Sequence, residues 1–137
     1  MPTPSEIETF LSGAFTQFDT KITAVGDRGA TIRREVKEQD LRPGGTVSGP
    51  TLMAMADTAL YVALFGEIGI VPMAVTTNMN INFLRRPSGS AAIIAVCKLL
   101  KVGRSLAVGE VSLYSEGDSA PVAHVVGTYS IPPDARK

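Results

Sequence analysis

Two neighbouring features of the sequence could do chemistry: a lone carboxylate, Asp57, and a glycine-rich loop at residues 43–49. Asp57 is the only charged residue between Arg42 and Glu67, and the segment around it, residues 50–65, is apolar on nearly all sides of a helix. Such a helix is predicted to be buried. A buried carboxylate loses its water, which costs several kcal/mol unless the group is paired or hydrogen-bonded. The sequence therefore predicts either a structural partner for Asp57 or a chemical role, and the loop before it favours the chemical role.

The glycine-rich loop leads directly into the predicted helix, where free backbone N–H groups and the helix dipole favour negative charge. Residues 44–51 are one residue short of a nucleotide-binding P-loop, but Pro50 replaces the lysine, which excludes nucleotide hydrolysis. The same amides could polarise a carbonyl, as an oxyanion hole does. Because proline has no N–H, Gly49 is the better donor candidate. The alternative is that these residues form only a turn and a helix cap.

Asp57 and the helix N-terminus are predicted to be too far apart to act on one substrate within a single chain. Asp57 follows Pro50 by seven residues, which puts both on one helix face about 10 Å apart along the axis. Reacting atoms need to approach to about 3–3.5 Å. A two-fold dimer with antiparallel central helices would bring Asp57 of one chain near Gly49 of the other. We therefore expect self-association, as a homodimer or as a homotetramer built as a dimer of dimers.

The single histidine, His124, and the single cysteine, Cys97, limit the other kinds of site. A Ser-His-Asp hydrolase with Ser48 or another serine as nucleophile is disfavoured, because the sequence has no G-x-S-x-G motif. A hydratase that uses Asp57 with His124 stays open. One His and one Cys in separate strands supply too few ligands for a metal. We expect no metal and no cofactor.

Basic side chains cluster near predicted turns and could bind the phosphates of a large carrier, because arginine binds phosphate through paired hydrogen bonds. The alternative is a set of solvated turn residues. These basic residues are Arg85, Arg86, Lys98, Lys101 and Arg104. Several large apolar residues of the central helix could line a tunnel for the rest of the substrate, or could equally belong to the core. They are Met53, Met55, Tyr61, Leu64 and Phe65.

The composition predicts one domain over residues 1–137. Lys plus Arg and Asp plus Glu number 13 each, which argues against nucleic acid or an acidic membrane as partner. Cys97 cannot form an internal disulfide, so a reducing, cytoplasmic location is expected. No basic segment leads into an apolar run as in a signal peptide. The apolar stretch 52–65 is predicted to be too short to span a bilayer.

The hydrophobic pattern predicts an α+β fold with one helix near the N-terminus and one in the middle of the chain. The first helix begins with a capping box at residues 3–6 and ends near Gly13; the second runs from Pro50 to about residue 65 and stops at Gly66 or Gly69. Strands are predicted at residues 19–25, 30–36, 73–84, 91–101, 106–115 and 121–131. The last four follow one another through short turns and predict an antiparallel meander wrapped around the buried central helix.

The residues around Asp57 also resemble a known family. Residues 45–59 resemble the H-G-G-x-x-x-x-L-x-D-x-A signature of hotdog-fold acyl-CoA thioesterases, with most similarity to the phenylacetate-degradation thioesterases. Residues 77–87 resemble the strand that follows in that family with its basic exit, and residues 103–105 resemble its later hairpin. The resemblance covers residues 41–130 and implies an antiparallel sheet around one central helix.

By position, the resemblance implies that Asp57 is the catalytic acid residue, acting as general base on water or as nucleophile towards the thioester. It implies that the Gly49 N–H polarises the thioester carbonyl. It also implies that Arg85, Arg86 or Arg104 contacts the phosphates of coenzyme A. The expected reaction is hydrolysis of an acyl-CoA thioester to free acid and thiol, with coenzyme A present only as part of the substrate.

The chain departs from the family pattern at the helix entrance. Ser48 replaces the motif histidine and could bond a substrate or water without carrying charge, and Pro50 replaces the second glycine. Arg42 stands where related enzymes often have an amide residue. With Tyr61, these residues complete the candidate site. The lost histidine keeps two alternatives open: a non-catalytic protein that binds acyl-CoA or another apolar ligand, and the hydratase.

Overall fold

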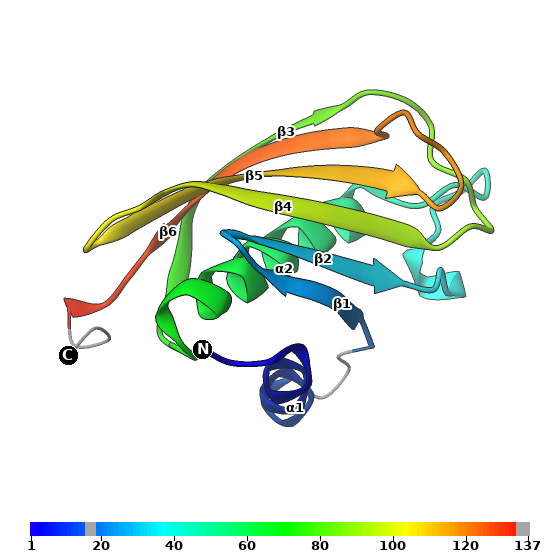
Figure 1. Cartoon of the computed structure of the whole chain (residues 1–137). Helices are drawn as coiled ribbons and strands as arrows, with labels where there is room; N and C mark the ends of the chain where they lie inside the picture. Colours follow the sequence, from blue (N-terminus) through cyan, green and yellow to red (C-terminus); the bar gives the residue numbers. More distant parts are fainter. Residues whose placement is uncertain (16–18, 134–137) are drawn as a thin grey trace.

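The computed structural model describes residues 1–15 and 19–133. A six-stranded antiparallel sheet curves around one long helix, and a short N-terminal helix packs beside the first strand (Figure 1). This is the predicted α+β hotdog arrangement. The elements are α1 (Pro4–Ala14), β1 (Lys21–Gly26), β2 (Gly29–Arg34), the 3-10 helix η1 (Glu38–Asp40), α2 (Gly49–Ile68), β3 (Val75–Phe83), β4 (Ile93–Val102), β5 (Leu106–Ser115) and β6 (Ala123–Ser130).

Local sequence signals set the ends of several elements. The capping box is confirmed: the Thr3 side chain accepts from the Glu6 N–H, and the Glu6 carboxylate accepts from the Thr3 N–H. The β1–β2 hairpin turns through Asp27 and Arg28, which both adopt positive φ (52° and 61°), as a tight two-residue turn requires. Gly69, at φ 93°, caps the C-terminus of α2, because a residue without Cβ adopts this conformation without strain.

The central helix α2 is buried against the sheet, but one face of its first half is open: residues 50, 53 and 54 are exposed and residues 57, 58 and 61 are half-buried. Its N-cap is Ser48 and Gly49 is the first helical residue, so the predicted start at Pro50 is correct to within one residue. The helix continues past Gly66, where the absent side chain leaves room for Val25 of β1. The core side chains of the helix are Leu52, Met55, Ala56, Ala59, Leu60, Val62, Ala63, Leu64 and Phe65.

At 20 residues, α2 is longer than the apolar stretch recognised in the sequence, and it is the one helix among the described residues with the length and composition of a membrane span. That property is weak evidence for a membrane, because the core helix of a soluble protein has it too. In this chain, 56% of the apolar 18-residue stretch of α2 is buried inside the fold. The stretch 52–65 was predicted to be too short to span a bilayer, but the helix that contains it is long enough to do so. Its predicted place as the central helix inside the sheet is confirmed.

The strand order is β1-β2-β4-β5-β6-β3. The predicted antiparallel meander is therefore confirmed for β4, β5 and β6 and is wrong for β3, which lies beside β6 and not beside β4. β3 pairs with β6, from Val75 opposite Ser130 to Phe83 opposite Ala123. β4 pairs instead with β2, because the chain after β3 crosses the end of the sheet before β4 begins. β3 is consequently an edge strand.

A β-bulge in β3 interrupts the simple alternation of its side chains between the two faces of the sheet. The strand register shifts between Thr76 and Asn78, and a bulge moves every later residue to the opposite face. Ala74, before the bulge, is buried, and Met79 and Ile81, after it, pack against the same core.

α2 packs closely on the sheet where Leu60 lies against two glycines. Gly109 of β5 and Gly127 of β6 are directly paired, and a Cβ on either would lie 2.6 Å from a Leu60 methyl carbon. Glycine at these positions therefore sets the distance between the helix and the sheet.

Replacing Gly127 with Ala is expected to lower the free energy of unfolding by about 1–3 kcal/mol, the usual cost of overpacking a core. Urea unfolding followed by circular dichroism measures the change. Gly13→Ala is the matched control, because a Cβ there meets no atom within 4 Å and alanine favours a helix over glycine. Equal stability of the two variants would contradict the packing argument.

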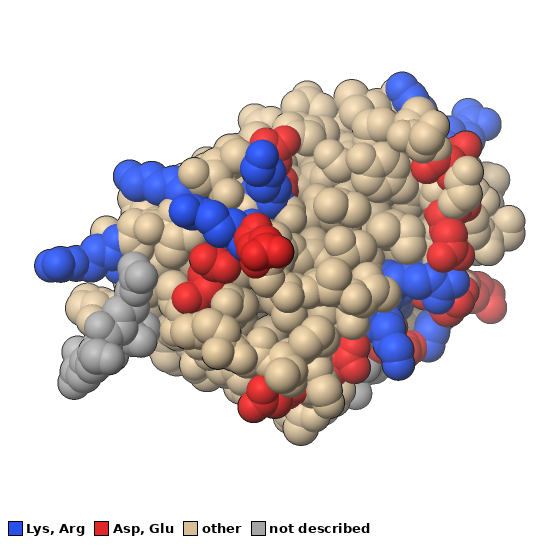
Figure 2. Space-filling view, in the orientation of Figure 1, with Lys and Arg blue, Asp and Glu red and all other residues tan. Residues whose placement is uncertain are grey.

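Charged side chains of both signs gather toward the two ends of the face shown in Figure 2, and the middle of that face is uncharged. Lysine and arginine lie beside aspartate and glutamate in both groups. A nucleic-acid site needs a continuous basic surface, and this face does not present one.

Candidate active site

Asp57 lies midway along α2 and is half-buried, with two hydroxyl groups bound to the same carboxylate oxygen. Thr76 Oγ1 of β3 donates to Asp57 Oδ1 at 2.5 Å, and the Tyr129 hydroxyl of β6 approaches Oδ1 to 2.6 Å. The Tyr129 hydroxyl also lies 3.1 Å from the backbone carbonyl oxygen of Asp57. Among the described residues, none donates to Oδ2. The carboxylate is thus held by one oxygen while the other stays available.

The carboxylate opens onto a pocket of about 780 Å³ between α2, α1, β3 and β6. Besides Asp57, Thr76 and Tyr129, the lining is largely apolar or aromatic: Leu11, Ala14, Phe15, Thr58, Tyr61, Pro72, Ala74 and Val75. Such a lining suits the apolar part of a small-molecule ligand.

Of the five residues expected to line a tunnel or the core, Tyr61 alone lines this pocket. Met55, Leu64 and Phe65 are buried in the core instead, and Met53 is exposed. Burial, and then the nearby Asp57 carboxylate, raises the pKa of the Tyr61 hydroxyl, so it stays neutral.

The N-terminus of α2 presents a single free amide. Pro50 has no N–H, the Thr51 N–H donates to Ser48 Oγ at 3.3 Å, and the Leu52 N–H donates to the Ser48 carbonyl at 3.2 Å. The Gly49 N–H has no acceptor among the described residues. The Gly49 N–H, which the sequence predicts as the donor, is thus the amide left available at this end of the helix.

Gly49 lines a second pocket, of about 470 Å³, together with three of the predicted substrate-binding residues: Arg42, Arg85 and Arg86. Arg104 lies apart from them, in a pocket of about 550 Å³ at the β4–β5 turn. Within one chain, the predicted basic residues therefore divide into two groups. Pro50 is exposed on the first turn of the helix.

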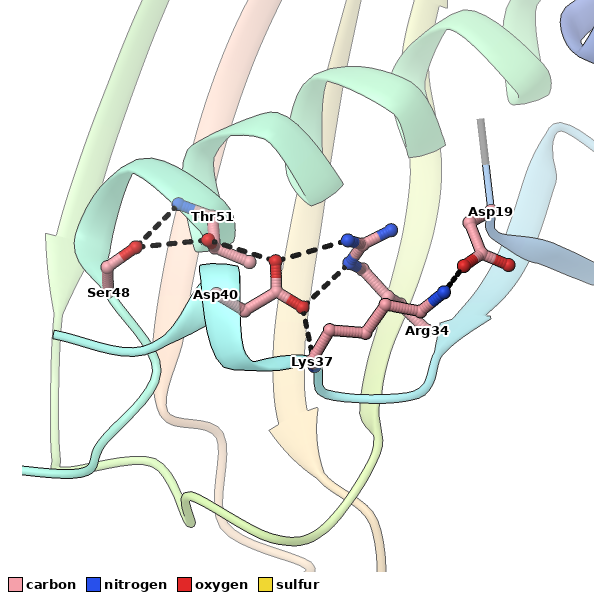
Figure 3. A network of polar contacts seen from close by, with 6 residues as sticks. All are labelled: Asp19, Arg34, Lys37, Asp40, Ser48 and Thr51. Atoms are coloured by element: carbon pink, nitrogen blue, oxygen red, sulfur yellow. Dashed lines mark hydrogen bonds and ion pairs between the residues drawn. The ribbon is translucent and has the colours of Figure 1, made fainter. Parts of the chain in front are cut away.

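Ser48 belongs to a polar network that holds the loop before α2 (Figure 3). Its hydroxyl donates to Thr51 Oγ1 at 3.0 Å, and Thr51 Oγ1 in turn lies 3.5 Å from Asp40 Oδ1. Arg34 binds both oxygens of Asp40 with its guanidinium, at 3.0 and 3.1 Å. Ser48 therefore has a structural role as the helix cap, and its predicted role at the site stays a prediction.

Asp40 is the centre of this network and is only 4% exposed. Its backbone carbonyl accepts the Ser48 N–H at 2.8 Å, which fixes the residue just before Gly49. Burial by itself raises the pKa of Asp40, but the Arg34 bonds, the Lys37 N–H and the Thr51 hydroxyl outweigh it, so the net pKa is lowered. Lys37 also pairs with Asp19. Asp40 therefore stays charged and anchors the helix entrance.

His124 lies on the opposite side of the sheet from Asp57. Ala123, Val125 and Tyr129 of β6 are buried toward α2, whereas His124 alternates with them and its Nε2 lies 3.2 Å from Glu110 Oε1. A hydratase with Asp57 and His124 in one chain is incompatible with this arrangement.

The sequence of residues 44–122 matches the model of the thioesterase superfamily. This match covers more than half of the chain and includes the glycine-rich loop, α2 and Asp57. The chain belongs to the thioesterase superfamily. As a member, it is a thioester hydrolase.

Solved structures agree with this assignment. A candidate thioesterase from Silicibacter sp. TM1040 is 42% identical, with a TM-score of 0.87 over 95% of this chain and 92% of that one. A mutant of the phenylacetic acid degradation protein PaaI from Thermus thermophilus is 24% identical, with a TM-score of 0.73 over 90% and 99%. A hypothetical thioesterase from Streptococcus pneumoniae, solved with coenzyme A, is 18% identical, with a TM-score of 0.78 over 92% and 96%. The last two show the shared hotdog fold.

Proposed function

We propose that the protein hydrolyses acyl-CoA thioesters at sites built from two subunits, with Asp57 from one and Gly49 from its neighbour. One observation carries this proposal: each chain holds an oriented carboxylate and a free helix amide in two different pockets. The two residues are eight positions apart on α2, or about 12 Å along the axis. Neither the Asp57 carboxylate nor the Gly49 amide can complete the reaction without the other.

The proposed reaction uses Asp57 Oδ2 and the Gly49 N–H on opposite sides of one thioester. Asp57 acts as general base, removing a proton from water while the water oxygen attacks the carbonyl carbon, or as nucleophile that attacks it directly. The carbonyl oxygen gains negative charge and accepts the Gly49 hydrogen bond. The C–S bond then breaks and the thiolate takes up a proton. In the nucleophilic route, water then cleaves the acyl–aspartate bond.

The edge strand β3 supports self-association. Its backbone edge is unpaired among the described residues, and it carries exposed apolar side chains at Val75 and Phe83, which are 54% and 55% exposed. Such an edge pairs readily with another strand. Pairing with β3 of a second copy about a two-fold axis would extend the sheet and set the two α2 helices antiparallel. A homodimer, or a dimer of such dimers, follows.

Coenzyme A is the proposed thiol carrier because three arginines surround the Gly49 pocket. Arg42, Arg85 and Arg86 are exposed there and have the planar donors that suit phosphate. The coenzyme A in the Streptococcus relative supports a carrier of this kind.

Thiol release from matched acyl-CoA and acyl-pantetheine thioesters, with short, medium, long and aromatic acyl groups, tests the proposal. Replacing Arg85 and Arg86 together with Gln is expected to raise KM for acyl-CoA at least about tenfold, the loss of one charge-assisted hydrogen bond. KM for acyl-pantetheine should stay unchanged, because it lacks the nucleotide phosphates. Binding of acyl-CoA without turnover of any member would contradict the proposal. An equal rise in KM for both substrates would contradict the carrier assignment.

A further inference from the structure

Tyr129 is one of the two side chains that bind Asp57 Oδ1, and like Thr76 it lies outside residues 45–59, which resemble the family signature. Its side chain is 5% exposed, and its hydroxyl reaches Asp57 Oδ1 across the sheet-helix boundary. We propose that Tyr129 positions Asp57 for catalysis, holding Oδ1 so that Oδ2 faces the substrate. This inference rests on the proposed role of Asp57.

The surroundings of Tyr129 leave its hydroxyl little freedom. Its ring stacks on Tyr61 with centroids 5.8 Å apart, and Tyr61 packs in turn against Phe65 at 4.3 Å. The Tyr61 hydroxyl donates to the Pro72 carbonyl at 2.9 Å, which fixes that ring as well. The Tyr129 hydroxyl is thereby held where it meets Asp57, and a rigid donor orients a carboxylate better than a mobile one.

Two donors on one oxygen leave the other as the reactive one. Thr76 and Tyr129 come from different strands, β3 and β6, and both reach Oδ1. A carboxylate has lone pairs on both oxygens, so occupying Oδ1 directs the incoming water or thioester to Oδ2. The arrangement selects the geometry of attack as well as the conformation of the side chain.

Tyr129 also stays a donor over the working pH range. Burial, and then the Asp57 hydrogen bond, raises the pKa of its hydroxyl, against a smaller opposing effect of Thr76. Among the described residues that line this pocket, Tyr61 is the other titratable group beside Asp57 and Tyr129, and it is neutral. A hydrogen bond to the charged form of a carboxylate favours that form.

Tyr129→Phe tests the inference, because it removes the hydroxyl and keeps the ring. We expect kcat for the best acyl-CoA to fall about tenfold and the acidic limb of the pH profile of kcat/KM to move about one unit higher. KM should change little, since the hydroxyl acts through Asp57. Tyr114→Phe on β5 is the matched control and should leave both quantities unchanged.

A purely structural role would overturn the inference. It would appear as a lower Tm for Tyr129→Phe with the wild-type pH profile and kcat. A second variant, with 3-fluorotyrosine at position 129, serves if Tyr129→Phe does not fold, because it keeps the hydroxyl. Its more acidic hydroxyl donates a stronger hydrogen bond and should move the acidic limb of the kcat/KM profile to lower pH. An acidic limb that does not move would also overturn the inference. If wild type is active and Asp57→Asn is inactive, failure of these shifts removes the role of Tyr129 alone. Activity retained in Asp57→Asn would remove the proposed function as well.

Discussion

Asp57→Asn is expected to lower kcat for thioester hydrolysis by about 10³-fold, within the range for loss of a catalytic base. Asparagine keeps the shape of the side chain, and its carbonyl oxygen can still accept the Thr76 and Tyr129 bonds. It cannot take a proton from water or act as an oxygen nucleophile. Steady-state thiol release measures the loss, and an unchanged circular dichroism spectrum and Tm show that the fold is intact.

Mixing two inactive variants tests whether the site is shared. Gly49→Pro removes the amide donor, whose loss costs about 10²–10³-fold in kcat, and proline is tolerated at the first helical position. When Asp57→Asn and Gly49→Pro subunits exchange at equal amounts, half of the dimers contain one of each. Each such dimer has one intact site and one doubly defective site, so the mixture should recover about one quarter of wild-type activity.

As a control, each variant is taken separately through the same dissociation and reassociation steps. Neither variant should regain thioesterase activity on its own. Lack of recovery after mass spectrometry has shown subunit exchange would mean that both groups act within one chain. Light scattering gives a separate check, since a monomer at micromolar concentration would also contradict the shared site.

The sequence was informative about Asp57 and Gly49 because both depend on local rules. One acid in an apolar helix and one amide before a proline are visible without knowing what packs against them. Thr76 and Tyr129 were missed because they meet Asp57 across 19 and 72 positions of chain. Their contact depends on β3 pairing with β6 and on the bulge that turns Thr76 toward α2, and no short-range pattern encodes either.

Asp40 was missed for a different reason. Between Lys37 and Leu41 it reads as an ordinary loop acid, and its burial follows from the 3-10 turn and the position of Arg34 at the end of β2. The structural role of Ser48 could have been predicted from its type alone, because serine is a preferred N-cap residue. That preference was the available signal for its structural role.

Asp40→Asn is expected to lower the free energy of unfolding by about 3 kcal/mol at pH 7, because removing one partner of a buried ion pair leaves the other charge uncompensated. Arg34 and Asp40 retain only 14% and 6% side-chain exposure. Glu116→Gln, which breaks the exposed pair with Arg33, is the control and should change stability little. Urea unfolding at several pH values measures both variants.

The pH dependence separates the charge of Asp40 from its shape. The folded pKa of Asp40 is lowered, so its contribution is complete above the unfolded value of about 3.9 and is lost as pH falls through the folded pKa. The stability gap between wild type and Asp40→Asn should therefore be constant near neutrality and close progressively below about pH 4. A gap that persisted at pH 2 would mean that hydrogen-bond geometry, not charge, holds this loop. Because Asp40 also fixes Ser48, the variant should lose part of its kcat even where it is fully folded, since the Gly49 amide is then less well positioned.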